Sequence, residues 1–161
     1  MKQVKIKLEG GFMPTKGSNY AAAYDLYCPQ DIDLKAGRQV VDLLFCLELP
    51  PQLAATVQPR SGFSCKGMEV EYHLEDGTVV PDYRLDADVV RGLIDEDFRN
   101  HCGVIVKVHQ KIGVNERAVL KKGTRFAQLQ IVNVPETYLF EVNELDYSKD
   151  RGGGYGHTGT K

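Results

Sequence analysis

The stretch GLIDEDFRN, residues 92–100, places the carboxylates of Asp95 and Asp97 two positions apart and follows them with the aromatic ring of Phe98. In a strand or a tight hairpin both carboxylates would point to the same face, because side chains alternate with a period of two. Burying two like charges on one face is costly. This segment is therefore the first candidate for a functional site, and the rest of the sequence has to explain its use.

A second candidate is PRSG at residues 59–62, which follows a predicted strand and places Arg60, Ser61 and Gly62 at a turn. Arginine supplies a planar fork of donors, serine supplies a hydroxyl, and glycine lets backbone amides approach an anion closely. The combination suits an anionic ligand, although a purely structural turn is the commoner interpretation of these residues.

Two further segments allow a functional and a structural interpretation. Gln128 stands within the alternating pattern KGTRFAQLQ at 122–130, where the ordinary interpretation is an outward polar residue on a half-buried strand. RGGGYG at 151–156 has the composition of a disordered tail. It could also close over a ligand, with Arg151 and glycine amides on a phosphate and Tyr155 on a base.

The elements that must position these residues are predicted to be nearly all β-strands. Short alternating or β-branched runs recur between turn sequences, and no window predicts an amphipathic helix of ten or more residues. Many short strands with regular turns predict a sandwich, a jelly roll or a small barrel. EDG at 75–77 predicts the tip of a local hairpin. The predicted strands are VKIKL, YDLYC, DIDLK, QVVDLLFCLEL, AATVQ, VEYHL, TVV, CGVIVKV, RFAQLQIVNV and YLFEV.

The length and composition exclude several classes of protein. The 161 residues, 42% hydrophobic and 26% charged, predict one soluble globular domain. A net charge of −2 provides no general positive field for binding nucleic acid. The start MKQVKIKLEGG has a strand pattern rather than that of a secretory signal, and no apolar run approaches the ~20 residues of a membrane span.

The four cysteines are widely and irregularly spaced, so we expect reduced, partly buried thiols in a cytoplasmic protein, or a nuclear one in a eukaryotic or viral setting. HLE at 73–75 matches half of a zinc-deaminase signature, but the PCxxC half is missing. The four histidines also lack paired ligand spacing. The spacing therefore predicts no structural metal site. The residues concerned are Cys28, Cys46, Cys65, Cys102, His73, His101, His109 and His157.

Five segments in order resemble the five motifs of the trimeric dUTPase family, the dUTP nucleotidohydrolases. They are AAAYDLYC (21–28), PRSG (59–62), GLIDEDFRNHCG (92–103), KGTRFAQL (122–129) and RGGGYGHTG (151–159). One such motif would be weak evidence, whereas five in order over nearly the whole chain are specific. The resemblance implies one all-β domain over residues 1–161, a jelly-roll-like barrel or sandwich with a flexible glycine-rich C-terminal arm at 148–161.

The resemblance assigns the opening stretch to the uracil and deoxyribose pocket. It implies that Asp95 is the catalytic residue, which orients the attacking water and contacts the 3′-hydroxyl, while Asp97 holds the hairpin or meets solvent. Phe98 stands at a family tyrosine that packs on the sugar. Backbone groups between Leu93 and Gly103 would read the base edge. The implied residues of this pocket are Gly92, Leu93, Ile94, Phe98, Gly103 and Tyr155.

The same resemblance implies Mg²⁺-dependent attack of water on the α-phosphate of dUTP, which gives dUMP and pyrophosphate. This reaction limits uracil incorporation into DNA and supplies dUMP for thymidylate synthesis. Mg²⁺ would be held on the triphosphate mainly through water, and Asp25 would bind those waters. Family members are homotrimers in which the tail of one subunit covers the site of another. The implied phosphate-binding residues are Arg60, Ser61, Gly62, Gln128, Arg151, Gly153, Gly154, His157 and Thr158.

The chain departs from the family pattern at several positions. The gap between the second and third motifs is longer than usual, so residues 68–84 are predicted to be an inserted hairpin, either a passive addition or an edge that binds a protein partner. The fifth motif has one residue fewer than usual between Arg151 and Tyr155. The single-residue departures are Phe98 for Tyr, Asn100 for Gly, Thr124 for Asp, Tyr155 for Phe and His157 for Ser.

Two other functions remain open from the sequence. A dCTP deaminase would share the fold and the PRS turn, but it would need a catalytic glutamate in the third-motif hairpin and would lack this glycine-aromatic tail. Glu96 would point away from Asp95 on an alternating strand. A regulatory protein that retains nucleotide binding and holds a protein partner through residues 68–84 is the non-enzymatic alternative.

Overall fold

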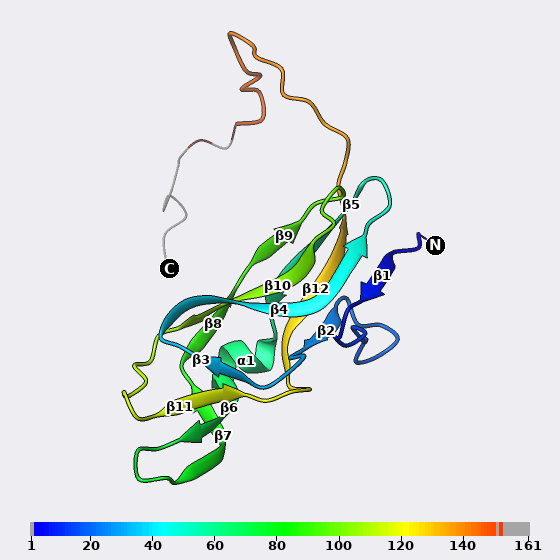
Figure 1. Cartoon of the computed structure of the whole chain (residues 1–161). Coiled ribbons are helices and arrows are strands. Elements are labelled where there is room, and N and C mark those ends of the chain that lie inside the picture. Colours follow the sequence, from blue (N-terminus) through cyan, green and yellow to red (C-terminus); the bar gives the residue numbers. More distant parts are fainter. Residues whose placement is uncertain (1, 151, 153–161) are drawn as a thin grey trace.

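The computed structural model describes residues 2–150 and residue 152, and it consists almost entirely of antiparallel β-strands (Figure 1). The all-β prediction is confirmed. The elements are β1 Lys5–Leu8, β2 Tyr24–Tyr27, β3 Ile32–Leu34, β4 Gly37–Glu48, β5 Leu53–Pro59, α1 Ser61–Lys66, β6 Met68–His73, β7 Val79–Leu85, β8 Ala87–Val90, β9 Gly92–Ile94, β10 His101–Val108, β11 Arg117–Leu120 and β12 Arg125–Asn133.

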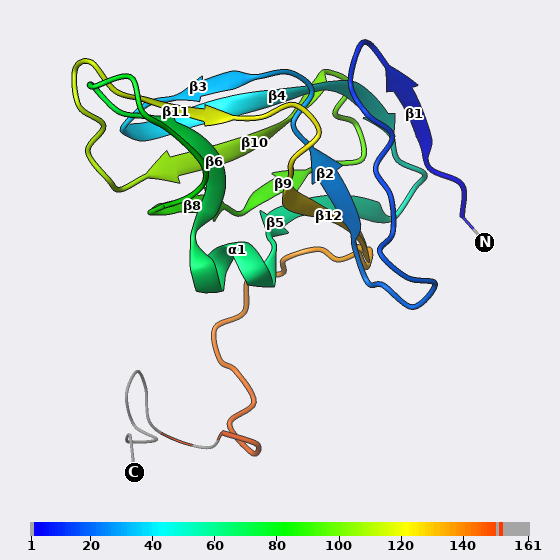
Figure 2. The same cartoon turned by 90° about the horizontal axis from the view of Figure 1, so that it is seen from below.

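These strands form three four-stranded sheets around a common core. Sheet A has the order β1-β4-β10-β8, sheet B the order β2-β12-β5-β9, and sheet C the order β3-β11-β6-β7. In Figure 2 the strands β12 and β5 of sheet B lie below β4 and β10 of sheet A. The core is packed with side chains from all three sheets, including Phe45, Leu26 and Leu120. The burial of β10 alternates strictly, as expected when one face of a strand covers a core.

The hairpin predicted around EDG is present, because β6 and β7 pair with the turn at 74–78 between them. Within sheet C, β6 lies between β11 and β7, and Met68, Val70 and Tyr72 are buried. The rings of Tyr72 and Tyr83 lie 4.5 Å apart across the hairpin. The first half of segment 68–84 is thus an interior strand, and of its two strands only β7 lies at an edge of the sheet.

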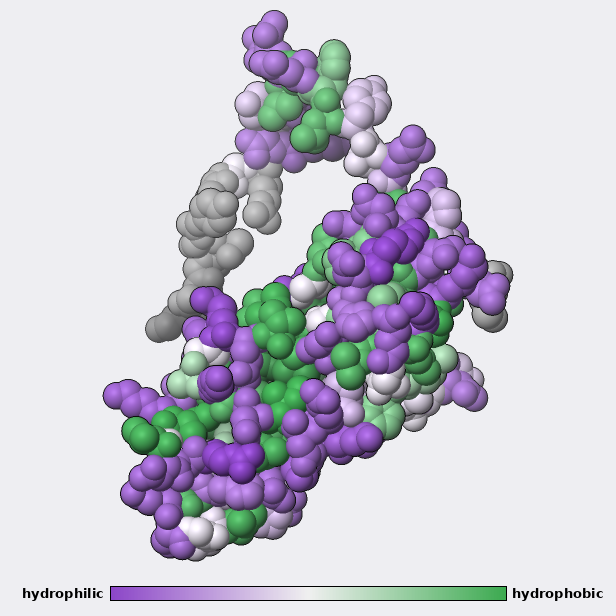
Figure 3. Space-filling model, in the orientation of Figure 1, coloured by the Kyte–Doolittle hydropathy of each residue, from purple (hydrophilic) through white to green (hydrophobic). Residues whose placement is uncertain are grey.

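The predicted strand YLFEV at 138–142 is wrong for a single chain. This segment follows β12, belongs to no strand, and leaves the side chains of Tyr138, Leu139 and Phe140 exposed. In Figure 3 its apolar residues lie in the upper part of the molecule, away from the body. A strand needs a neighbour to pair with its backbone, and the described part of this chain places none beside the segment.

The predicted hairpin in the third motif is also wrong. β9 pairs with β5 in sheet B, whereas β10 pairs with β4 and β8 in sheet A. Residues 95–100 therefore connect two sheets and do not form the tip of a two-stranded ladder. Asp95 and Asp97 are exposed in this loop, so the expected placement on one face of a strand does not apply.

The turn predicted at PRSG is the start of a short helix. Arg60 ends the extended segment after β5 with φ −82° and ψ 141°, and α1 begins at Ser61. Phe63 is buried and anchors the helix to the core. α1 has only 6 residues, and among the residues that the structure describes no helix is long and apolar enough to cross a membrane.

Candidate active site

Asp25 on β2 is the centre of a polar cluster. It is buried, with 4% of its surface exposed. Its Oδ1 accepts a hydrogen bond from Arg60 Nε at 3.1 Å and another from Gln128 Nε2 at 3.2 Å. A buried carboxylate is stable only when it is paired and hydrogen-bonded, and these two donors meet that requirement. The structure thus brings together three residues predicted from three separate motifs.

A second arginine, which the sequence reasoning did not select, completes the cluster. Arg125 Nη1 donates to Asp25 Oδ2 at 3.3 Å, and Arg60 Nη1 donates to the backbone oxygen of Arg125 at 3.1 Å. Arg125 stands within the quoted fourth motif, three residues before Gln128. Its positive charge and its place in this motif are the features by which the sequence could have identified it. Two guanidinium groups are therefore fixed by one carboxylate.

The register of sheet B explains why these residues meet. β12 lies between β2 and β5, so Gln128 is opposite both Asp25 and Gln58. Arg60 comes directly after β5, at the same end of the sheet. The pairing of β12 with β2 shifts between Arg125 and Ala127. Such an irregularity changes the alternation of side chains, and Arg125 and Gln128 both reach Asp25.

A cleft of about 370 Å³ adjoins the cluster and carries several positive charges. Arg60, Lys66, Arg84 and Arg125 line it together with Gly62, whereas Glu69 is held by Arg84 at 2.7 Å. Ser61 is exposed at the start of α1. Several cations around one cleft can bind a ligand with several negative charges, and the fork geometry of arginine suits phosphate oxygens.

The third-motif loop forms a different, acidic surface. Asp95, Glu96 and Asp97 line a pocket of about 490 Å³ together with Gln52 and Glu136. The carboxylates are exposed, so the cost of burying two like charges does not arise in the single chain. A positioned carboxylate in such a loop can accept a proton from water.

The loop is held by a turn that starts at Asp95. The backbone amide of Phe98 donates to the backbone oxygen of Asp95 at 3.2 Å, and the ring of Phe98 is 37% exposed. Leu93 is exposed, whereas Ile94 is buried in the core and Gly92 is half-buried. The three predicted pocket residues on β9 therefore differ in exposure. Because its side chain is buried, Ile94 can offer only its backbone to a ligand.

Gly103 on β10 allows a close approach between strands. A Cβ atom at this position would lie 2.7 Å from Val40 Cγ1. The remaining predicted residues, Arg151, Gly153, Gly154, Tyr155, His157 and Thr158, lie outside the described residues.

The two groups of site residues lie at opposite ends of β5. Gln128 pairs with Gln58, whereas Ile94 pairs with Ala55, so Asp95 follows at the level of Ala54. Four residues along a strand correspond to about 13 Å. In Figure 1, α1 and the far end of β9 lie in different parts of the molecule. Within one chain, the Asp95 side chain therefore makes no direct contact with the Asp25 cluster.

Glu96 has a structural contact that the alternating-strand argument missed. Its carboxylate accepts a hydrogen bond from the backbone amide of Gln52 at 2.9 Å. Gln52 has φ +64°, a left-handed conformation that costs energy for a non-glycine residue. Glu96 thus stabilises the turn before β5. Glu96 lies in a loop and not on a strand, so the prediction that it points away from Asp95 on an alternating strand does not apply.

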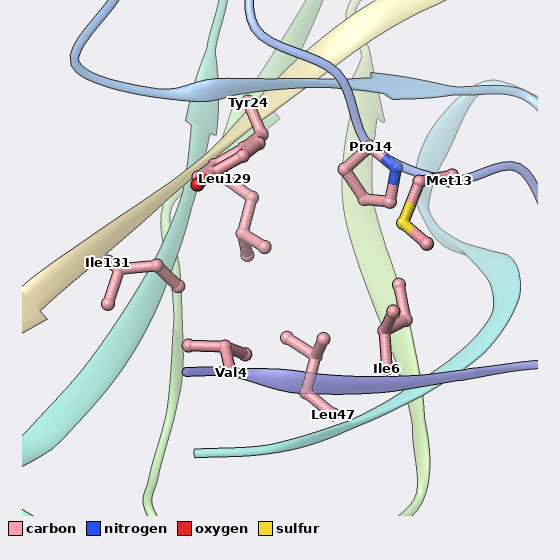
Figure 4. Close-up of a pocket in the computed structure, with 8 residues that line it drawn as sticks. All are labelled: Val4, Ile6, Met13, Pro14, Tyr24, Leu47, Leu129 and Ile131. Atoms are coloured by element: carbon pink, nitrogen blue, oxygen red, sulfur yellow. The ribbon is translucent and has the colours of Figure 1, made fainter. Parts of the chain in front are cut away.

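A third pocket is unsuited to a charged ligand. In Figure 4 its lining side chains converge between β1 and the strands β2 and β12, and the lining carries no charged residue. Its volume is about 120 Å³. A cavity of this kind can receive an apolar side chain but offers no donors for phosphate. The lining residues are Val4, Ile6, Met13, Pro14, Tyr24, Leu47, Leu129 and Ile131.

Comparison with known families identifies the arrangement. The dUTPase family model matches residues 10–159, which include all the clustered residues and the third-motif loop. The chain belongs to the dUTPase family. Its viral relatives include the deoxyuridine 5′-triphosphate nucleotidohydrolase of Variola virus, 35% identical over 150 residues, with 92% of this chain and 86% of the relative covered. The enzyme of the same name from Syntrophotalea carbinolica is 32% identical over 166 residues, with 99% of both chains covered.

Solved dUTPase structures confirm the fold. A mutant dUTPase of Staphylococcus bacteriophage 80alpha with dUpNHpp gives a TM-score of 0.76 at 21% identity, covering 99% of each chain. The dUTPase of phage phi11 of S. aureus, described as visualising a species-specific insert, gives 0.71 at 18% identity and covers 89% of this chain and 98% of that one. The predicted family membership and fold are both correct.

Proposed function

We propose that this protein hydrolyses dUTP to dUMP and pyrophosphate, with Mg²⁺ on the triphosphate, in a homotrimer with composite active sites. The observation that carries the proposal is the cluster in which Asp25 holds Arg60, Arg125 and Gln128 together beside a cationic cleft. Named viral and bacterial dUTP nucleotidohydrolases at 32–35% identity over nearly the whole chain support the choice of substrate.

In this proposal, the two arginines and Gln128 bind the phosphates, with Ser61 and the backbone at Gly62 beside them. Asp25 orients the guanidinium groups before the substrate arrives, so little reorganisation is needed during the reaction. Negative charge accumulates on the phosphate oxygens as water attacks the α-phosphorus and its bond to the bridging oxygen breaks. Fixed cations at those oxygens stabilise the transition state more than they would in water.

Asp25 fits an indirect role toward Mg²⁺. Mg²⁺ prefers oxygen ligands and retains several waters when it is bound to substrate phosphates. A carboxylate offers about four acceptor positions, and three on Asp25 are taken by Arg60, Gln128 and Arg125. The remaining position can accept a hydrogen bond from a metal-bound water. When bound, Mg²⁺ would neutralise phosphate charge and activate the phosphorus toward attack.

Asp95 would act as the general base. Its carboxylate is exposed at the turn, where it can accept the proton of the attacking water while that oxygen forms its bond to the α-phosphorus. Phe98 would pack against the deoxyribose and leave no room for a 2′-hydroxyl. Backbone groups between Leu93 and Gly103 would read the base edge, which favours uracil because the exocyclic amine of cytosine would face an amide donor.

The separation of the two groups supports assembly from several copies. Asp95 lies about 13 Å along β5 from the level of Gln128, and in this proposal the loop of another subunit brings Asp95 to the same substrate. Symmetric homo-oligomers form such shared sites routinely. The exposed apolar side chains of segment 134–147, such as Leu139 and Phe140, offer surface for contacts between subunits.

The proposed capping of the site by the C-terminal arm has a direct test. Arg151, Gly153, Gly154, His157 and Thr158 would bind phosphate, and Tyr155 would stack on uracil. Ending the chain at Asp150 should then lower turnover by orders of magnitude and leave the trimer and its melting temperature unchanged. Tyr155→Ala should be nearly as damaging. If both variants hydrolyse dUTP at the normal rate, the arm does not cap this site.

The alternatives are less well supported. A deaminase would need a catalytic glutamate in this loop, whereas the carboxylate of Glu96 is hydrogen-bonded to the backbone amide of Gln52. A protein partner that paired with the free edge of this hairpin would meet Pro81 within β7, which removes a backbone donor. A phage 80alpha structure is described as part of a mechanism that controls transfer of virulence genes. In this chain, a packing role for the hairpin fits the observed contacts better.

One experiment separates these functions. The full-length protein is incubated with Mg²⁺ and, in parallel, with dUTP, dCTP, dTTP or UTP, and the products are identified by chromatography. We expect dUMP and pyrophosphate from dUTP and little product from the others. Release of ammonia from dCTP would indicate a deaminase. Tight binding of dUTP without turnover, in the presence of Mg²⁺, would indicate a regulatory protein.

A further inference from the structure

Three side chains that commonly bind transition metals converge on sheet A, away from the Asp25 cluster. They are Glu9, which follows β1, Cys46 on β4 and His101 on β10, and their ligand atoms all lie within 4.8 Å of one another. His101 Nε2 lies 2.6 Å from Glu9 Oε2, and Cys46 Sγ lies 3.7 Å from the same oxygen. Within the described residues, this carboxylate, thiol and imidazole are the group whose composition suits a metal.

The fold gathers these residues by distorting β4. Two steps along β10, from His101 to Gly103, correspond to four steps along β4, from Cys46 to Asp42. The bulge includes Leu44 in the left-handed region at φ +53°, a costly conformation for leucine. As a result Cys46 and Asp42, four positions apart, both reach the vicinity of His101.

The N-terminal segment is fitted closely to this bulge. The backbone oxygen of Leu44 accepts hydrogen bonds from the amides of Glu9 at 2.9 Å and Gly11 at 3.0 Å. A Cβ atom on Gly11 would lie 2.0 Å from the backbone oxygen of Leu43, so only glycine permits this approach. The contact holds Glu9 beside His101.

Asp42 provides the hydrogen bond that a metal-binding histidine normally makes through its other ring nitrogen. Its Oδ2 lies 2.9 Å from His101 Nδ1, while its Oδ1 accepts the amide of Leu44 at 2.8 Å. A carboxylate on Nδ1 holds the proton there and leaves the lone pair of Nε2 for a metal. Nε2 is the nitrogen that faces Glu9, so the imidazole is already oriented for coordination.

We propose that Glu9, Cys46 and His101 bind Zn²⁺, with a water as the fourth ligand, and that the ion clamps the end of β1 to β4 and β10. Zinc favours tetrahedral sites of sulfur, nitrogen and carboxylate oxygen. A thiolate and an imidazole select it over Mg²⁺, which prefers oxygen ligands. Zn²⁺ with the Cys46 thiolate, the carboxylates of Glu9 and Asp42, and the Lys7 ammonium on the other Glu9 oxygen is neutral overall.

Metal binding would compete with protons at His101 and Cys46. Hydrogen bonds to Asp42 and Glu9 raise the pKa of His101, and partial burial together with the Glu9 carboxylate raises the pKa of the Cys46 thiol. On coordination the Cys46 thiol loses its proton and the Nε2 lone pair of His101 binds the metal, because zinc ligands must be deprotonated.

The test uses full-length protein without a histidine tag. After equilibration with equimolar Zn²⁺ and desalting, we expect one zinc ion per chain by mass spectrometry and a higher melting temperature, since binding to the native state stabilises it. Co²⁺ in place of Zn²⁺ should give a thiolate-to-cobalt charge-transfer band. An excess of Mg²⁺ should not displace either ion.

Cys46→Ser should abolish the cobalt band, and His101→Asn and the surface substitution Glu9→Gln should each lose zinc on desalting. The controls are Cys65→Ser, which removes an exposed thiol, and His109→Asn, which removes a histidine paired with Asp88 at 2.8 Å. Both controls should retain zinc.

A chain ended at Asp150, which lacks His157, should also retain zinc. A wild-type protein that retains no zinc would overturn the proposal. So would a zinc ion and cobalt band that survive Cys46→Ser and Glu9→Gln in folded protein, as judged by circular dichroism.

Discussion

At one end of sheet B, Asp25 is buried and accepts hydrogen bonds from three side chains, whereas at the other end Asp95 lies exposed in a turn. Both carboxylates come from motifs of the same family, and both are proposed to act on one substrate. Their surroundings differ because one carboxylate positions cations within the chain, and the other has to remain accessible to water and substrate.

This difference has a consequence for assembly. A set of fixed charges can be completed within one chain, since its partners are neighbouring strands of the same sheet. The loop at 95–100 has no such partners across its exposed side, and its carboxylates repel one another only weakly while water surrounds them. In the proposed trimer another copy supplies the missing half of the site, which would link catalysis to oligomerisation.

The largest expected effect is at the exposed end. Asp95→Asn should retain the fold and the affinity for dUTP but lower turnover at least ~100-fold, the lower bound for a positioned base. Steady-state kinetics and equilibrium binding of a non-hydrolysable dUTP analogue measure the two effects separately. Asp97→Asn, two positions away in the same loop, is the matched control and should cost far less. Equal losses at both positions would refute the assigned roles.

Mixed trimers test whether the two ends come from different chains. Arg60→Ala and Asp95→Asn proteins, each nearly inactive alone, are unfolded, mixed in equal amounts and refolded together. If each site takes Arg60 from one subunit and Asp95 from another, about one quarter of the sites are intact and activity returns. No recovery, although mixed trimers are detected by native mass spectrometry, would show that each site belongs to one chain.

At the buried end the expected effect is smaller and is divided between stability and affinity. Asp25→Asn retains one acceptor but turns an amide toward an arginine, so the native state should lose roughly 1–3 kcal/mol. We expect a lower melting temperature and about tenfold weaker binding of dUTP, because the arginines lose their orientation.

The matched control for Asp25 is Asp33→Asn. Asp33 also accepts hydrogen bonds from an arginine, Arg117, at 2.9 and 3.0 Å, but both side chains are at least half exposed. An exposed pair of this kind contributes only ~0–1 kcal/mol. A loss at Asp33 as large as that at Asp25 would show that burial is not what makes the cluster important.

The sequence predicted most of the strands well for a physical reason. Alternation of apolar and polar residues reports burial directly, as in β4 and β10, and the EDG turn predicted the β6–β7 hairpin. Asp25 and Gln128 lie on the neighbouring strands β2 and β12 of sheet B, and Arg60 directly follows β5, so residues of three separate motifs meet.

The wrong predictions share another cause. Local sequence patterns do not show which distant segments pair as strands. β9 and β10 are adjacent in sequence but belong to different sheets, so the expected hairpin is absent. YLFEV has the residue types of a strand but no neighbouring strand in the described chain. Glu9, Cys46 and His101 are separated by at least 37 residues and meet only through the bulge in β4, so ligand spacing did not reveal them.

The smallest expected effect concerns discrimination at the exposed end. If the ring of Phe98 alone excludes a 2′-hydroxyl, Phe98→Tyr should leave the ratio of kcat/KM for dUTP and UTP nearly unchanged, because the added hydroxyl lies beyond the ring that contacts the sugar. Phe98→Ala removes that wall and should lower the ratio, with most of the change in the rate for UTP. The ring is 37% exposed in the single chain, so its removal leaves no buried cavity and the melting temperature should change little. A large gain in discrimination for Phe98→Tyr would show instead that a hydroxyl at this position contributes to recognition, and that the chain has lost part of the selectivity of its family.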